Sequence, residues 1–218
     1  MANALYVFDL DDTLINGDCA TIWNEFLVAK GIVIAPNFLE EDKRLMHLYA
    51  IGKMEMDDYL SVSLAPLANM PIETVNGLVT ECVTHRILPK QFSQASALIE
   101  QLHRDDMDML IISASPAFLV KQVGQALGIP HALGIDLVEQ NGCYTPNIRG
   151  VVSYRAGKVT RLAQWLASQD KSYATIHFYS DSINDLPLCQ YADYTYLVNP
   201  CPQLAKHANQ PNWTVLQW

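Results

Sequence analysis

The fold is decided by the stretch LYVFDLDDT, residues 5–13. Its first four residues are apolar and β-prone without alternation, which is typical of a strand covered on both faces, as in a parallel sheet. Asp9 and Asp11 follow where this strand meets solvent. Because alternate residues of an extended chain point the same way, the two carboxylates can share one small volume.

Two carboxylates in one small volume repel each other. The pair is tolerated if a divalent cation offsets one charge and a proton neutralises the other. The segment therefore suits phosphoryl transfer. On this segment alone, the alternative is a polar turn rich in Asp and Thr.

The composition is that of an ordinary globular protein. The chain has 218 residues, 50% of them hydrophobic, which is enough for one domain with a sizeable insertion. The net charge of −9 disfavours nucleic acid or an anionic membrane as a partner. A phosphorylated metabolite can still bind where a metal ion, a lysine and backbone N–H groups make the pocket locally positive.

Cysteine usage indicates a reducing compartment, and hydropathy gives no sign of a membrane-spanning helix. The 5 cysteines are scattered and contain no Cys-x-x-Cys pair, so neither a disulfide framework nor a zinc site is indicated. No apolar run approaches the ~18 to 20 residues that a membrane-spanning helix requires. Since the N-terminus leads directly into a strand, we expect a cytoplasmic protein.

The order of predicted elements indicates an α/β fold. Residues 17–88 show helical spacing and almost no strand signal. Beyond them, helices are predicted at 91–104, 116–127 and 156–168, and strands at 107–113, 132–138, 175–180 and 194–198, with a possible edge strand at 213–216. Asn141-Gly142 indicates a hairpin turn. We expect a Rossmann-like, mainly parallel sheet core (residues 1–16 and 89–218) with a helical cap (residues 17–88) inserted after the first strand.

Three predicted strands end in polar residues, and ligands bind beyond the carboxyl ends of parallel strands. The first strand delivers Asp9 and Asp11, the second delivers Ser113, and the third leads into the stretch SDSIND, residues 180–185. Lys158 lies at the start of a predicted helix.

Each of these features also has an ordinary explanation. Ser115-Pro116 resembles a helix N-cap followed by proline at the first helical position, Asp181 and Asp185 could cap a turn, and Lys158 could be solvated. Taken together, the features favour a common functional site over these separate explanations.

The four segments resemble, in order and spacing, the four motifs of the haloacid dehalogenase superfamily of phosphohydrolases. The matching segments are DLDDTL (residues 9–14), Ile112-Ser113, Lys158 and SDSIND (residues 180–185). The resemblance covers roughly residues 5–198. It implies a helical C1-type cap at the predicted insertion, and the fourth motif resembles that of the phosphoserine-phosphatase-like branch, subfamily IB.

The resemblance implies a role for each motif residue. Asp9 is the expected nucleophile, which forms an aspartyl-phosphate and divides the hydrolysis into two easier steps. Asp11 is the expected acid and base, which protonates the leaving alcohol and then accepts a proton from water. Ser113 and Lys158 are expected to hold the phosphate oxygens, and Asn184 to position Lys158 or the phosphate.

The same resemblance implies a Mg²⁺ cofactor. Asp9, the backbone carbonyl of Asp11 and Asp181 are the expected ligands, and Asp185 is expected to support them directly or through water. An oxygen shell of this kind suits magnesium.

Two features bear on the substrate. Asp18 stands where phosphoserine phosphatases have a glutamate that reads the substrate ammonium, so we expect it to contact the substrate. The cap segment 59–66 lacks the arginine that would pair with an amino-acid carboxylate. Phosphoserine therefore ranks below other small phosphomonoesters, and the chain is similar to the group that includes histidinol-phosphate phosphatases.

The sequence thus predicts a Mg²⁺-dependent phosphomonoesterase, a monomer or homodimer, that acts on a small phosphorylated metabolite through an aspartyl-phosphate. The alternatives are a phosphatase specific for phosphoserine or histidinol phosphate, and a phosphotransferase or mutase. A non-enzymatic module that responds to metal and phosphate is the alternative from another class.

Overall fold

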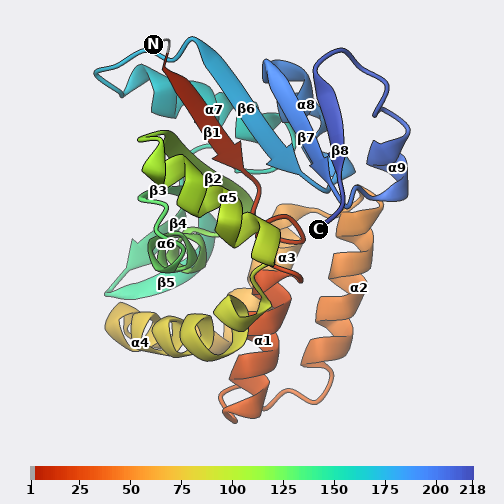
Figure 1. Ribbon diagram of the computed structural model, residues 1–218. Helices are drawn as coiled ribbons and strands as arrows, with labels where there is room; N and C mark the ends of the chain where they lie inside the picture. Colours follow the sequence, from red (N-terminus) through yellow and green to blue (C-terminus); the bar gives the residue numbers. More distant parts are fainter. Residues whose placement is uncertain (1–2) are drawn as a thin grey trace.

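A six-stranded parallel sheet forms the centre of the protein (Figure 1). The computed structural model describes residues 3–218, so the first two residues of the expected core lie outside it. The strand order is β3-β2-β1-β6-β7-β8, and every neighbouring pair is parallel. The strands are β1 (Ala4–Phe8), β2 (Asp108–Pro116), β3 (His131–Ile135), β6 (Thr175–Ser180), β7 (Tyr194–Val198) and β8 (Trp213–Leu216). This arrangement confirms the predicted α/β class with a parallel sheet.

Helices cover both faces of the sheet, which explains the continuous apolar run of β1. Val7 packs with Leu162 and Leu188 on one face, and Phe8 packs with Ile99 on the other. Figure 1 shows α7 and α8 behind the sheet and α5 in front of it. These core elements are α5 (Ser93–Arg104), α6 (Ala117–Ala126), α7 (Ala156–Ala167), the short turn η4 (Ile183–Asp185), α8 (Leu186–Tyr191) and α9 (Pro202–Ala205).

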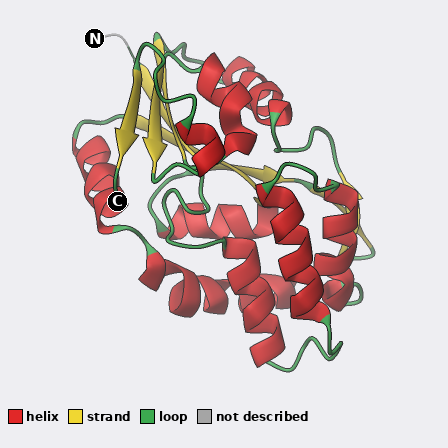
Figure 2. Cartoon of the chain, turned by 90° about the vertical axis from the view of Figure 1, so that its right-hand side faces the viewer, coloured by secondary structure: helices red, strands yellow, loops and turns green. Residues whose placement is uncertain are grey.

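In the sequence, a group of helices lies between β1 and β2, and it occupies the lower part of the view in Figure 2. It contains α1 (Cys19–Ala29), α2 (Phe38–Ala50), α3 (Met56–Leu64), η1 (Ala65–Leu67), α4 (Ile72–Cys82), η2 (Val83–Ile87) and η3 (Leu88–Lys90). Trp23 and Phe26 of α1 are buried with Leu60 of α3, so these helices have apolar packing of their own. We call this helical group the cap. The expected division at residues 16 and 88 stays a prediction.

A two-stranded antiparallel hairpin, β4 (Leu137–Gln140) and β5 (Cys143–Ile148), contacts the cap. Asn141 and Gly142 form its turn with φ values of 52° and 74°, because a two-residue hairpin turn of this type needs positive φ at both positions. The turn therefore confirms the prediction from Asn141-Gly142.

Three elements differ from the sequence prediction. The single strand expected at 132–138 is interrupted at Asp136, and its two parts belong to different sheets. The strand expected to end at Ser113 continues to Pro116, and the next helix begins at Ala117. The short helix α9 was not predicted, whereas the expected edge strand at 213–216 is present as β8.

Candidate active site

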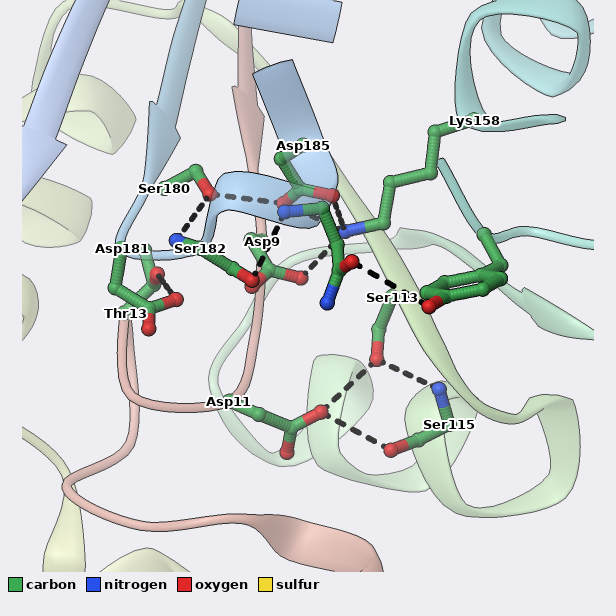
Figure 3. Close-up of polar contacts among 12 residues, drawn as sticks. Asp9, Asp11, Thr13, Ser113, Ser115, Lys158, Ser180, Asp181, Ser182 and Asp185 are labelled. Atoms are coloured by element: carbon green, nitrogen blue, oxygen red, sulfur yellow. Dashed lines mark hydrogen bonds and ion pairs between the residues drawn. The ribbon is translucent and has the colours of Figure 1, made fainter. Parts of the chain in front are cut away.

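Three parallel strands end at the same edge of the sheet and bring the motif residues together (Figure 3). Asp9 directly follows β1, Ser113 lies near the end of β2, and Asp181 follows β6. Asp12 has a φ of 53°, a left-handed conformation that aspartate tolerates better than most residues. The chain therefore turns back immediately, and the Leu14 N–H donates to the carbonyl of Leu10 at 2.9 Å.

A buried lysine joins two of the carboxylates. Lys158 is 0% exposed, and its Nζ lies 2.8 Å from Asp9 Oδ1 and 2.7 Å from Asp185 Oδ1. The Ser180 hydroxyl donates to Asp185 Oδ2 at 2.8 Å and fixes that carboxylate from the other side. Figure 3 shows the ammonium group between the two acids.

The charges of this group are coupled. Burial alone would lower the pKa of Lys158, but the carboxylates of Asp185 and Asp9 outweigh burial and hold the pKa above its ordinary value. Burial also raises the pKa of Asp9, against the opposing effect of Lys158. Lys158 therefore stays an ammonium group and supplies positive charge where a phosphate would meet Asp9.

A close backbone approach delivers Lys158 to this position. A Cβ at residue 157 would overlap the carbonyl oxygen of Val152, so only glycine lets the loop before α7 pack against the start of that helix. Gly157 immediately precedes Lys158 in the first turn of α7.

Asp11 is held by three donors. The Cys19 N–H donates to Asp11 Oδ1 at 2.7 Å, and the hydroxyls of Ser113 and Ser115 donate to Oδ2 at 3.1 and 3.0 Å. The interpretation of Ser115 as a helix N-cap was therefore wrong, because β2 extends past this residue and aims its hydroxyl at Asp11. The spacing of Ser113 and Ser115 along an extended strand, which places both on one side, was the signal that could have identified it.

Asp181 lies beside Asp9 on the opposite side from Lys158. The Thr13 hydroxyl donates to Asp181 Oδ1 at 3.3 Å. Burial, followed by the charge of Asp9, raises the pKa of Asp181 well above its ordinary value. Lys158 pairs with Asp9 and Asp185, whereas no ion pair within residues 3–218 gives Asp181 a cationic partner.

The donor set fits a small hard cation. Within residues 3–218, no three His, Cys, Asp or Glu side chains are grouped so that they could hold a metal ion by themselves. The expected magnesium site needs fewer side-chain ligands, because the carboxylates of Asp9 and Asp181 are combined with a backbone carbonyl. Water or phosphate supplies the remaining oxygens. Asp185 is engaged by Lys158 and Ser180, so its expected contribution to this set stays a prediction.

A cavity of about 480 Å³ opens above the carboxylates. The core contributes Asp9, Asp11 and Asp181, and α2 of the cap contributes Met46, His47 and Tyr49, among other residues. The cavity is large enough for a small phosphorylated metabolite.

Asp18 also lines this cavity, and its expected contact with a substrate stays a prediction. It is the N-cap of α1, where its Oδ1 accepts from the Thr21 N–H at 2.6 Å. Burial, followed by the charge of Asp11, raises the pKa of Asp18 to about 8. The free carboxyl group of Asp18 is therefore largely protonated at neutral pH, and a cationic ligand group beside it would favour the ionised form.

Asn184 is directed to the cap. Its Nδ2 donates to the carbonyl of Tyr49 at 3.0 Å, and its Oδ1 accepts from the Tyr154 hydroxyl at 3.3 Å. Among the hydrogen bonds of residues 3–218, none joins Asn184 to Lys158. No direct hydrogen bond therefore supports the expectation that Asn184 positions this lysine. Its part in substrate binding stays a prediction.

Other sequence features have structural explanations. His177 stacks between Tyr6 and Tyr194, with ring centroids 4.6 and 4.8 Å away, which is the environment of a packed sheet residue. Cys19 is fully buried. No helix among the described residues has the length and apolar character needed to cross a membrane.

Known proteins match the chain over nearly its whole length. The family model described as haloacid dehalogenase-like hydrolase matches residues 6–190. A protein from Neisseria meningitidis named histidinol-phosphatase is 34% identical over an alignment of 218 positions, which covers 98% of each chain.

Solved structures show the same fold. A protein of unknown function from Bordetella pertussis Tohama I superposes with a TM-score of 0.89 at 29% identity, over 99% of both chains. A structure described as a phospho-aspartyl intermediate analogue of phosphoserine phosphatase superposes with a TM-score of 0.71 at 20% identity, over 96% of this chain and 92% of the other.

Proposed function

Because this chain belongs to the haloacid dehalogenase-like hydrolase family, we propose that it is a Mg²⁺-dependent phosphomonoesterase that transfers the phosphoryl group to Asp9 and then to water. The observation that carries the proposal is the buried contact between Lys158 and Asp9, with Asp11 and Asp181 at the same edge of the sheet. The fold neighbour described as a phospho-aspartyl intermediate analogue supports the same route.

Asp9 is the nucleophile. A carboxylate oxygen of Asp9 bonds to phosphorus as the bond to the leaving oxygen breaks, which yields an acyl phosphate and an alcohol. Lys158 lets the two anions approach each other, since its ammonium group is fixed 2.8 Å from Asp9 Oδ1 before any substrate arrives.

Asp11 moves the proton. It donates a proton to the leaving alkoxide and then accepts one from the water that hydrolyses the acyl phosphate. The contacts from Cys19, Ser113 and Ser115 fix the direction of its carboxyl group, which proton transfer requires.

The residues that would hold Mg²⁺ are Asp9, the backbone carbonyl of Asp11, and Asp181, and Asp185 would support them directly or through water. The ion, when bound, would offset negative charge and orient the phosphate. Removal of the ion is therefore expected to abolish turnover while the fold is retained.

The substrate we propose is a phosphate ester of a small amino alcohol. Asp18 gives the cavity wall an acidic group suited to an ammonium, and the residues described as lining the cavity include no arginine or lysine. A substrate carboxylate would be buried there without an arginine or lysine to pair with, which disfavours phosphoserine. Histidinol phosphate has an amine and no carboxylate, and the 34% identical relative is named for it.

The first experiment measures phosphate release from p-nitrophenyl phosphate with and without Mg²⁺, in the wild type and in Asp9→Asn. We expect Mg²⁺-dependent turnover with one phosphate released per nitrophenolate, and its loss in Asp9→Asn. A requirement for an acceptor alcohol would instead indicate a phosphotransferase. Absence of turnover would favour the binding module.

The second experiment tests the substrate class with Asp18→Asn. Asparagine caps a helix as well as aspartate does, so α1 should be retained while the ionisable carboxyl group is lost. We expect kcat/KM for histidinol phosphate to fall about tenfold or more, the scale of one charge-assisted contact, with little change for p-nitrophenyl phosphate, which has no amine. An equal fall for both substrates would contradict the assignment.

A further inference from the structure

The cap and the core are joined by a group of contacts outside the catalytic residues. On the core side are Tyr154, Arg155 and Asn184, and on the cap side are Tyr49 and Gly52. The Arg155 guanidinium donates to the carbonyl of Gly52, and Asn184 Nδ2 donates to the carbonyl of Tyr49 at 3.0 Å. We call this group the clamp.

Aromatic contacts complete the clamp. The rings of Tyr49 and Tyr154 stack with centroids 5.5 Å apart, and the Arg155 guanidinium lies 4.8 Å from the centroid of Tyr154. The Tyr154 hydroxyl donates to Asn184 Oδ1 at 3.3 Å, so the core residues of the clamp also hold one another.

On the cap side, the clamp holds the last turn of α2. The final carbonyls of a helix have no partner within the helix, and they attract donors and cations. The same turn carries His47 and Tyr49, which line the cavity above Asp9. Movement of this end of α2 would therefore open or close the cavity wall.

On the core side, the clamp is continuous with the residues that hold Asp9. Tyr154 and Arg155 lead into the first turn of α7, where the Lys158 N–H donates to the carbonyl of Arg155 at 3.0 Å. Asn184 directly precedes Asp185, the second carboxylate paired with Lys158. The clamp is thus connected along the chain to both Lys158 and Asp185, through two separate segments.

We infer that Tyr154, Arg155 and Asn184 are positioning residues that hold α2 over the catalytic cavity and couple this closure to the placement of Lys158. This inference rests on the proposed phosphatase function. Each contact is weak by itself, and Arg155 is exposed, so the clamp can open to admit substrate and release product.

Two glycines provide a matched test. Gly52 and Gly31 both follow cap helices with positive φ, 67° and 71°, so alanine introduces the same kind of backbone strain at either position. A Cβ at residue 52 lies 2.8 Å from Arg155 Nη2, whereas a Cβ at residue 31 meets nothing within 4 Å. Gly52→Ala therefore displaces Arg155, and Gly31→Ala controls for the strain.

The first readout is amide hydrogen exchange of residues 47–51 in the full-length protein without substrate. We expect exchange to accelerate at least about tenfold in Gly52→Ala and Arg155→Ala, because local opening sets the rate, and to stay within about twofold in Gly31→Ala. Arg155→Lys keeps a cation that can donate to Gly52, so it should restore most of the protection.

The second readout is the kinetics with p-nitrophenyl phosphate and Mg²⁺. If only the closed state is competent, kcat/KM falls in proportion to its population, so we expect about a tenfold loss in Gly52→Ala and Arg155→Ala, with recovery in Arg155→Lys. Accelerated exchange with unchanged kcat/KM would overturn the positioning role. Equal behaviour of Gly52→Ala and Gly31→Ala in both readouts would overturn the clamp itself.

Failure of the proposed function would look different. Wild-type protein would then turn over no phosphate ester, while the exchange comparison would still decide whether these contacts hold α2.

Discussion

Lys158 and Asp9 form an ion pair that is buried before any substrate is present, with Nζ 2.8 Å from Oδ1. The lysine also neutralises Asp185, so one cation supports two carboxylates. Desolvated charges depend on such pairing, because an unpaired buried charge is strongly destabilising. The same side chain should therefore be needed both for stability and for phosphate binding.

Replacement of this lysine tests both roles. Lys158→Met should lower kcat/KM by about 10²-fold or more, the scale of a lost electrostatic contact to the transition state. It should also lower the free energy of unfolding by about 3–5 kcal/mol, the cost of breaking a buried pair. Kinetics and urea unfolding measure the two effects.

The control is Lys171→Met, which removes an exposed lysine paired with Asp108 and should lower the free energy of unfolding by less than about 1 kcal/mol. Equal stability of Lys158→Met and wild type would contradict this account of the pair.

The contact of Ser115 with Asp11 predicts a kinetic defect. Ser115→Ala removes one of the three donors that orient the carboxyl group, so kcat should fall about tenfold, the scale of one hydrogen bond. Steady-state kinetics with an alkyl phosphate measure this, since an alkoxide needs protonation to leave. Ser61→Ala, which removes an exposed hydroxyl in the cap, serves as the control. An unchanged kcat in Ser115→Ala would mean that this hydroxyl does not position Asp11.

Magnesium binding should be visible without turnover. At 100 times its Kd, a ligand that binds only the folded state adds about 2.7 kcal/mol, which for a protein of this size raises Tm by roughly 5–10 °C. Asp181→Asn should abolish most of that shift, because it removes an expected ligand. Differential scanning fluorimetry with and without Mg²⁺ gives the comparison, with the exposed Asp170→Asn as control. A full magnesium shift in Asp181→Asn would place the ion elsewhere.

The histidine within the sheet should make stability depend on pH. Burial lowers the pKa of His177, so the folded protein favours the neutral ring, which stacks on Tyr6 and Tyr194. Its contribution is present above the unfolded pKa of about 6.5 and is lost as the pH falls through the lower folded pKa. His177→Phe should therefore lose less stability than wild type between pH 7 and pH 5. Urea unfolding at fixed Mg²⁺ measures the difference, and parallel pH profiles would contradict the prediction.

Much of the fold follows from local patterns. The run at residues 5–8 lacks alternation because helices cover both faces of β1, and the carboxylates come directly after it because parallel strands end where ligands bind. Asn141-Gly142 was recognisable because few other pairs adopt positive φ at both positions. These signals reside in neighbouring residues, so a single sequence reveals them.

The remaining features depend on contacts between distant segments. Ser115 precedes a proline and a helix, and the local pattern of an N-cap is the same whether or not the strand continues to meet Asp11. Asn184 and Tyr49 are 135 positions apart in sequence, so their hydrogen bond has no local signature. The break at Asp136 likewise depends on which sheet each half joins.

The central claim is that Asp9 carries the phosphoryl group during turnover. In Asp11→Asn, p-nitrophenolate can still leave without protonation while the base for the second step is missing, so the acyl phosphate should accumulate. The most direct measurement is borohydride reduction of this variant during turnover of p-nitrophenyl phosphate, followed by mass spectrometry of the peptides. We expect residue 9 to be recovered as homoserine. The same variant treated with borohydride in the absence of substrate should show no conversion. Conversion at another carboxylate, with residue 9 intact, would contradict the account.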